Sequence, residues 1–121
     1  MTTEKTVLIV EDEGLVAMDI EDELSDRGWK TVAAVGTIDA AMSALETHVP
    51  DLALLDVNLR GTKSFDLALT LRDKGVAVVF LSGNSVNDLP ASLQDCAFVQ
   101  KPGNFDLLQT ALGNAGTGDR L

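Results

Sequence analysis

The chain has a single cysteine, Cys96, in 121 residues, so no internal disulfide can form. A reducing compartment is the natural setting for such a protein, and we expect a cytoplasmic location. The longest apolar run, Val76–Leu81, is far too short to span a bilayer. Residues 1–5 lack the basic and long apolar segments of a signal peptide. No association with a membrane is therefore expected.

Basic residues are also scarce, with 9 Lys and Arg against 19 Asp and Glu, for a net charge of −10. Sequence-independent binding of nucleic acid requires clustered Lys and Arg, so we expect no nucleic acid partner. The excess of acid suits a cation site, although solubility alone explains it as well. A hydrophobic fraction of 45% at this length fits one globular domain with its own core.

What the chain does have is a series of short apolar runs that alternate with amphipathic stretches. The runs are rich in Val, Ile, Leu and Ala, as in strands covered on both faces, and span 6–10, 31–35, 52–55, 76–81 and 96–100. Helical periodicity with an apolar stripe is found at 14–27, 38–48, 65–73 and 104–113. This order predicts five βα units, and thus a parallel sheet between layers of helices.

Details of the helical segments can also be predicted. Thr37 and Asn104 are expected N-caps. Met18 and Met42 lie on predicted helix faces and are expected in the core. Segment 84–94 contains Pro90 and several turn-forming residues, so it is expected to form only a short or irregular helix.

Polar residues with useful chemistry stand where four of the apolar runs end. Asp56 ends one run and opens a polar loop over 57–61, and Glu11 and Asp12 end another. Ser82 and Lys101 end two more. Open α/β sheets place their ligand sites at the carboxyl ends of strands. Three carboxylates, a hydroxyl and an ammonium there are suited to hold a divalent cation and a phosphoryl group.

Each of these residues also has an ordinary structural interpretation. Acids are common at helix starts, which alone explains Glu11 and Asp12. Ser82 precedes Gly83 in a common strand-to-turn pair, and a lysine at a strand end is usually solvated. Asp56 is either a plain loop carboxylate or a nucleophile that accepts a phosphoryl group. Mg²⁺ prefers oxygen ligands and is the expected cofactor of such a site.

Taken together, the motifs resemble the receiver domain of bacterial two-component response regulators over about residues 5–113. The resemblance rests on Val10-Glu11-Asp12-Glu13, the run 54–59, Phe80-Leu81-Ser82-Gly83 and the run 98–102. Part of the chain is also similar to an alphaproteobacterial subgroup of receivers that carries a Phe-Ala-Thr-Gly-Tyr-Gly motif. This chain reads Phe80-Leu81-Ser82-Gly83-Asn84-Ser85 there, and lacks the proline that many receivers carry after the phosphoacceptor.

The resemblance implies a flavodoxin-like (βα)5 fold, a three-layer sandwich with parallel strands in the order 2-1-3-4-5. It also implies a role for each matched residue. The acidic phosphoacceptor would be Asp56, and Mg²⁺ would be bound by Asp12, by Asp56, by the backbone carbonyl of Asn58 and, mostly through water, by Glu11. The phosphoryl group would be contacted by Ser82 and Lys101, and the switch would consist of Ser82 and Phe98.

The implied function is signalling rather than metabolism. A histidine kinase or histidine phosphotransfer protein would phosphorylate Asp56, and the domain would catalyse only its own phosphorylation and hydrolysis. The signal would leave by contact with a downstream protein that the sequence does not identify. We expect a single receiver domain over 1–121, with a core at 5–113 and a polar tail at 114–121. It would be a monomer or weak dimer, either stand-alone or excised from a larger protein such as a hybrid kinase.

Two other classes of protein fit the pattern less well. A Mg²⁺-dependent phosphatase with an aspartyl nucleophile would carry a second aspartate two residues after it, and this chain has Asn58 there. A flavin-binding electron carrier would carry a Ser-, Thr- or Gly-rich phosphate loop after the first strand. The acids at 11–13 would instead repel a phosphate.

Overall fold

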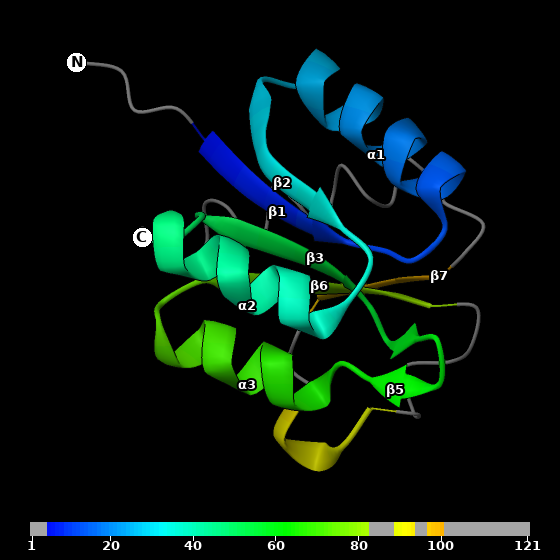
Figure 1. The fold of residues 1–121 in the computed structure, drawn as a ribbon, viewed down its shortest axis with the longest axis vertical. Helices are drawn as coiled ribbons and strands as arrows, with labels where there is room; N and C mark the ends of the chain where they lie inside the picture. The colour runs from blue at the N-terminus through cyan, green and yellow to red at the C-terminus, as the bar shows by residue number, and fades with distance from the viewer. Residues whose placement is uncertain (1–4, 83–88, 94–96, 101–121) are drawn as a thin grey trace.

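The computed structural model describes residues 5–82, 89–93 and 97–100, which contain a five-stranded parallel sheet (Figure 1). The strands are β1 (Lys5–Val10), β2 (Trp29–Val35), β3 (Leu52–Asp56), β6 (Ala77–Ser82) and β7 (Ala97–Gln100). Their order across the sheet is β2-β1-β3-β6-β7. Counted along the chain within this sheet, that is the predicted order 2-1-3-4-5, and every pairing is parallel.

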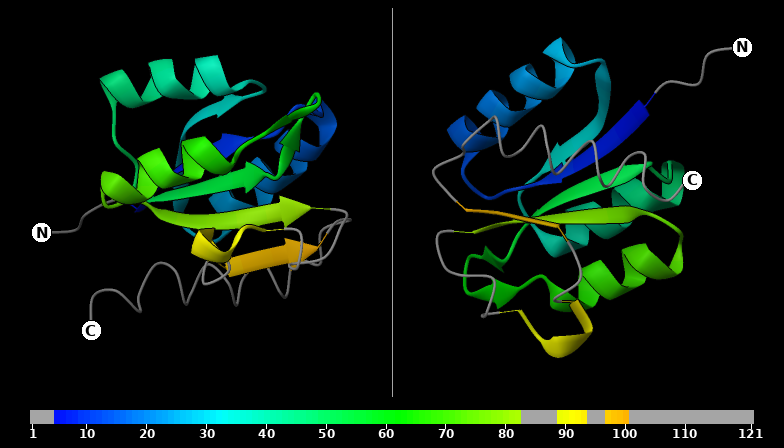
Figure 2. Two further views of the ribbon diagram at one scale, coloured as in Figure 1. Left: turned by 90° about the horizontal axis from the view of Figure 1, so that it is seen from below. Right: turned by 180° about the vertical axis from the view of Figure 1, so that it is seen from behind.

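Helices lie against both faces of the sheet. α1 (Gly14–Asp26) covers one face, while α2 (Ile38–Thr47) and α3 (Phe65–Asp73) cover the other (Figures 1 and 2). The hydroxyl of Thr37 accepts a hydrogen bond from Ala40 N at 3.1 Å, which confirms the predicted cap of α2. The expected helix at 104–113, with its cap Asn104, lies outside the described residues. Within the described ranges, no helix is long and apolar enough to cross a membrane.

The strands separate two clusters of buried apolar side chains because successive side chains point to opposite faces. Val7 and Ile9 pack toward α1. Leu8 and Val10 pack into the larger cluster with α2 and α3. Both faces are therefore buried, which is why the strand sequences are continuously apolar rather than alternating.

Two expected core residues are on the surface. Met18 is 59% exposed and Met42 is 40% exposed, so the prediction that they pack in the core is wrong. Each directly follows a buried alanine, Ala17 or Ala41. One residue along a helix turns the side chain by about 100°, which rotates both methionines away from the buried stripe.

The segment that was expected to be irregular is described only over 89–93. It contains a 3-10 turn at Ala91–Leu93, with Leu89 and Leu93 both buried. A side-chain nitrogen of Arg72 in α3 donates a hydrogen bond to the carbonyl of Ser92 at 3.1 Å. This part of the segment agrees with the prediction and is held against α3, whereas 84–88 and 94 lie outside the described residues.

The stretch after β3 is a small hairpin rather than the simple loop that was predicted. β4 (Asn58–Leu59) pairs antiparallel with β5 (Thr62–Lys63). The two turn residues, Arg60 and Gly61, have φ angles of 51° and 86°. Positive φ at both central positions is typical of a type I′ turn, which matches the twist of the two strands. Leu59 is buried, so the hairpin is anchored to the core.

The conformation of Arg60 generates a prediction for stability. An L-residue with a side chain loses about 1–2 kcal/mol in the left-handed region, and Asn tolerates it better than most. Arg60→Asn should therefore raise the free energy of unfolding by up to about 1 kcal/mol. Urea denaturation of Arg60→Asn and Arg60→Ala provides the measurement, because the alanine variant removes the same exposed side chain but keeps the unfavourable backbone. Equal stability of the two variants would contradict the prediction.

Candidate functional site

The candidate site lies where the strand order of the sheet reverses. β2 and β3 flank β1 on opposite sides, and such a reversal opens a crevice beyond the carboxyl ends of the strands. Glu11 and Asp12 follow β1, and Asp56 is the last residue of β3. Each of the three carboxylates offers an oxygen within 4.8 Å of the others. The structure thus brings together the three acids that the sequence placed at separate strand ends.

Two of these carboxylates are buried and bound by backbone N–H groups. Glu11 is 3% exposed and Asp56 is 7% exposed, while Asp12 is half-buried. Glu11 Oε2 accepts a hydrogen bond from Glu13 N at 3.0 Å, and Asp56 Oδ1 accepts one from Asn58 N at 3.3 Å. Because an ionised group is costly to bury without partners, these bonds help to hold negative charge at this edge. The bond from Glu13 N, the N-cap residue of α1, agrees with the interpretation of Glu11 as an acid at a helix start. That interpretation does not account for the proximity of Asp56 to both acids.

The backbone at Asp56 is also held by buried groups. Val57 N donates to the carbonyl of Leu81 in β6 at 3.0 Å. The hydroxyl of Ser64, which is fully buried, donates to the carbonyl of Asp56 at 2.7 Å. Ser64 is not among the site residues predicted from the sequence. Its place just before the helical pattern at 65–73 is a detectable signal, but that signal indicates an N-cap rather than a contact with Asp56.

The other predicted site residues are placed by the strands that carry them. Asp56 is paired with Leu81, so Ser82 lies one residue further along at the end of the neighbouring strand β6. Phe98 lies in β7 opposite Phe80. Asn58 is the first residue of the hairpin strand β4. Lys101 lies outside the described residues, so its approach to the site stays a prediction.

The donor set fits a small divalent cation. Mg²⁺ takes octahedral oxygen ligands at about 2.1 Å, which places opposite ligands roughly 4 Å apart. The 4.8 Å within which the three carboxylate oxygens lie is close to this span. The residues present therefore suit the expected cofactor.

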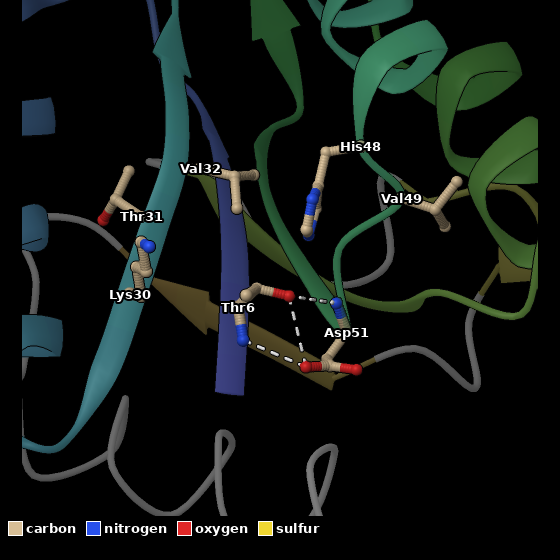
Figure 3. A pocket seen from close by; sticks show the side chains of 7 residues that line it. All are labelled: Thr6, Lys30, Thr31, Val32, His48, Val49 and Asp51. Atoms are coloured by element: carbon tan, nitrogen blue, oxygen red, sulfur yellow. Dashed lines mark hydrogen bonds between the residues drawn. The ribbon is translucent and has the colours of Figure 1, made fainter. Parts of the chain in front are cut away.

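Hollows away from the three acids are also found among the described residues. One, of about 540 Å³, is at the opposite end of the sheet and is lined by Thr6, Lys30, Thr31, Val32, His48, Val49 and Asp51 (Figure 3). There Thr6 and Asp51 bind each other through backbone and side-chain groups at 3.0–3.2 Å, which ties the start of β1 to the start of β3. Another, of about 370 Å³, is lined by residues around the start of α2 and in the hairpin, namely Gly36, Thr37, Ile38, Asp39, Leu59, Arg60 and Thr62.

Comparison with known proteins gives related sequences over most of the chain. The transcriptional regulatory protein PdtaR of Mycobacterium tuberculosis is 33% identical over 102 residues, which are 81% of this chain and 50% of PdtaR. The chain thus spans about half the length of the curated relatives it matches.

Solved structures of alphaproteobacterial receivers are similar over nearly the whole chain. The BeF3-activated conformation of SdrG from Pseudomonas melonis Fr1 is 36% identical with a TM-score of 0.82, and covers 97% of this chain and 100% of its own. The receiver domain of the response regulator PhyR from Erythrobacter litoralis is 26% identical with a TM-score of 0.83, and covers 93% of this chain and 89% of its own.

The family match agrees with the geometry of the site. Residues 7–113 match the family described as the response regulator receiver domain. This span includes the three acids and the carboxyl ends of all five strands of the sheet. The chain therefore belongs to the response regulator receiver domain family.

Proposed function

We propose that this chain is a phosphoacceptor receiver that takes a phosphoryl group onto Asp56 from a histidine kinase or a histidine phosphotransfer protein. The observation that carries the proposal is the meeting of Glu11, Asp12 and Asp56 within 4.8 Å at the switch point of the sheet. The carboxyl ends of the strands are also where open α/β sheets bind their ligands, so a phosphoryl donor would approach from this edge.

In the proposed reaction, a carboxylate oxygen of Asp56 attacks the phosphorus of a phosphohistidine. An O–P bond forms, the N–P bond breaks, and its electron pair returns to the imidazole of the donor. The hydrogen bond from Asn58 N to Asp56 Oδ1 at 3.3 Å helps to orient the carboxylate for the attack. Ser82 and Lys101 are proposed to contact the transferred phosphoryl oxygens, Ser82 as a hydroxyl donor and Lys101 as a positive charge.

Mg²⁺ would be held directly by Asp12, by Asp56 and by the backbone carbonyl of Asn58, with Glu11 acting through water. When bound, the ion would offset the negative charge that accumulates as a phosphoryl group approaches three carboxylates. Without a cation, the like charges of these acids oppose that approach. The domain would thus catalyse its own phosphorylation and hydrolysis, with no metabolic substrate.

The signal is proposed to leave through a change in contacts with a downstream protein. Ser82 and Phe98 are the proposed switch residues, on the adjacent strands β6 and β7. Added charge at Asp56 would shift a two-state equilibrium at the ends of these strands. We further propose one flavodoxin-like (βα)5 domain with its core at 5–113, in a cytoplasmic, monomeric or weakly dimeric protein.

The phosphorylation itself is directly testable. Incubation with acetyl phosphate and Mg²⁺ should add one base-labile phosphoryl group, detected by intact mass spectrometry. Asp56→Asn should abolish the gain because the amide is not a nucleophile. Asp73→Asn is the matched control, since it makes the same chemical change at an exposed position at the end of α3. No gain by the wild type, or a gain that survives Asp56→Asn, would refute the proposal.

The metal requirement gives a second prediction. Mg²⁺ should raise the melting temperature of the wild type, because a ligand that binds only the folded state stabilises it. Asp12→Asn should reduce this shift. It should also weaken the binding of Mg²⁺ by more than the roughly 10–100-fold that is typical when a residue supporting a metal only indirectly is changed. Thermal unfolding across a Mg²⁺ series, with Asp73→Asn as the control, measures both effects. A Mg²⁺ response in Asp12→Asn equal to that of the wild type would contradict the proposed ligand set.

A further inference from the structure

We propose that Ser64 is a positioning residue for the phosphoacceptor, acting through the backbone of Asp56. This inference rests on the proposed function of the site. Ser64 is fully buried, and its hydroxyl lies 2.7 Å from the carbonyl oxygen of Asp56 and 3.3 Å from that of Val57. A serine hydroxyl has one proton to donate, and the shorter distance directs it mainly to Asp56.

The two ends of the hairpin segment are thereby joined. Ser64 N also donates to the carbonyl of Val57 at 3.0 Å, so one residue binds two consecutive carbonyls at the end of β3. On the other side, Val57 N donates to Leu81 in β6 at 3.0 Å. The peptide that follows the phosphoacceptor is thus held both by the sheet and by Ser64.

The position of Ser64 in the chain shows that its hydroxyl is diverted from a more usual role. Ser64 is the N-cap residue of α3, where a serine normally accepts a bond from a free N–H of the first turn. Within the described residues, its side chain makes no such bond. Thr37, the N-cap of α2, does make the usual bond, at 3.1 Å. The hydroxyl of Ser64 therefore binds the backbone of Asp56 and does not cap the start of α3.

The consequence concerns the relative placement of two proposed Mg²⁺ ligands. The carboxylate of Asp56 and the backbone carbonyl of Asn58 both belong to the segment that Ser64 ties together. Loss of the hydroxyl would remove a donor from the carbonyls of Asp56 and Val57 at a fully buried position, and the local backbone would adjust to the lost bonds. Such an adjustment moves both ligands although Ser64 touches neither metal nor phosphoryl group.

The test compares two hydroxyl deletions at helix N-caps. Ser64→Ala and Thr37→Ala remove the same group, but only the first removes a bond to Asp56. Mn²⁺ binding, followed by the electron paramagnetic resonance signal of free Mn²⁺, should weaken about tenfold or more in Ser64→Ala. It should stay at the wild-type value in Thr37→Ala. The rate of phosphoryl gain from acetyl phosphate should fall in Ser64→Ala alone.

Further variants separate positioning from a loss of folding. Ser64→Thr keeps the hydroxyl and should bind Mn²⁺ more tightly than Ser64→Ala, and Ser64→Gly provides a second deletion if Ser64→Ala does not fold. Circular dichroism reports the folding of each variant. Wild-type Mn²⁺ affinity in a folded Ser64→Ala or Ser64→Gly would overturn the inference. If the wild type itself neither binds Mn²⁺ nor gains a phosphoryl group, the proposed function fails instead.

Discussion

Crowding of three carboxylates at one edge of a parallel sheet is the constraint on which the rest of this structure depends. Glu11, Asp12 and Asp56 offer oxygens within 4.8 Å of one another, and two of the three residues are buried. Like charges at this separation repel each other, and burial removes the water that would screen them. Backbone N–H groups from Glu13 and Asn58 offset part of this cost. A divalent cation would offset more, which connects the geometry to the chemistry of a receiver.

Rigid surroundings keep this arrangement in place. Every residue of β3 is buried, and the strand lies between β1 and β6 in the sheet. The segment after it returns to the core through Leu59 and is closed by the hydroxyl of Ser64. Phe65, the first residue of α3, packs edge-on against Phe80 of β6, with ring centroids 6.3 Å apart. The acid site is therefore in packed contact with both the sheet and the helix layer.

The helices, the strands and the acids at the strand ends were predictable because they depend on local sequence patterns. Apolar runs and helical stripes gave strands and helices with boundaries close to those observed. The acids were identified because each stands at the end of an apolar run, and the ends of parallel strands meet at one edge. The hairpin after Asp56 was missed since its strands have only two residues each, and Arg60 is an unusual residue for its turn. Met18 and Met42 were misplaced because each lies beside a buried alanine on its helix.

The order of the elements, the acids at the strand ends and the resemblance to receivers can all be read from the amino-acid sequence, since they are properties of neighbouring residues. The approach of the carboxylates to within 4.8 Å, and the bond from Ser64 to Asp56 in place of a cap on α3, follow from tertiary packing. Distances between residues far apart in the chain are set by how the layers pack. A serine before a helix can bind a free N–H of the first helical turn or a nearby backbone carbonyl. Here the buried carbonyl of Asp56 lies beside the hydroxyl and needs a donor, so it becomes the partner.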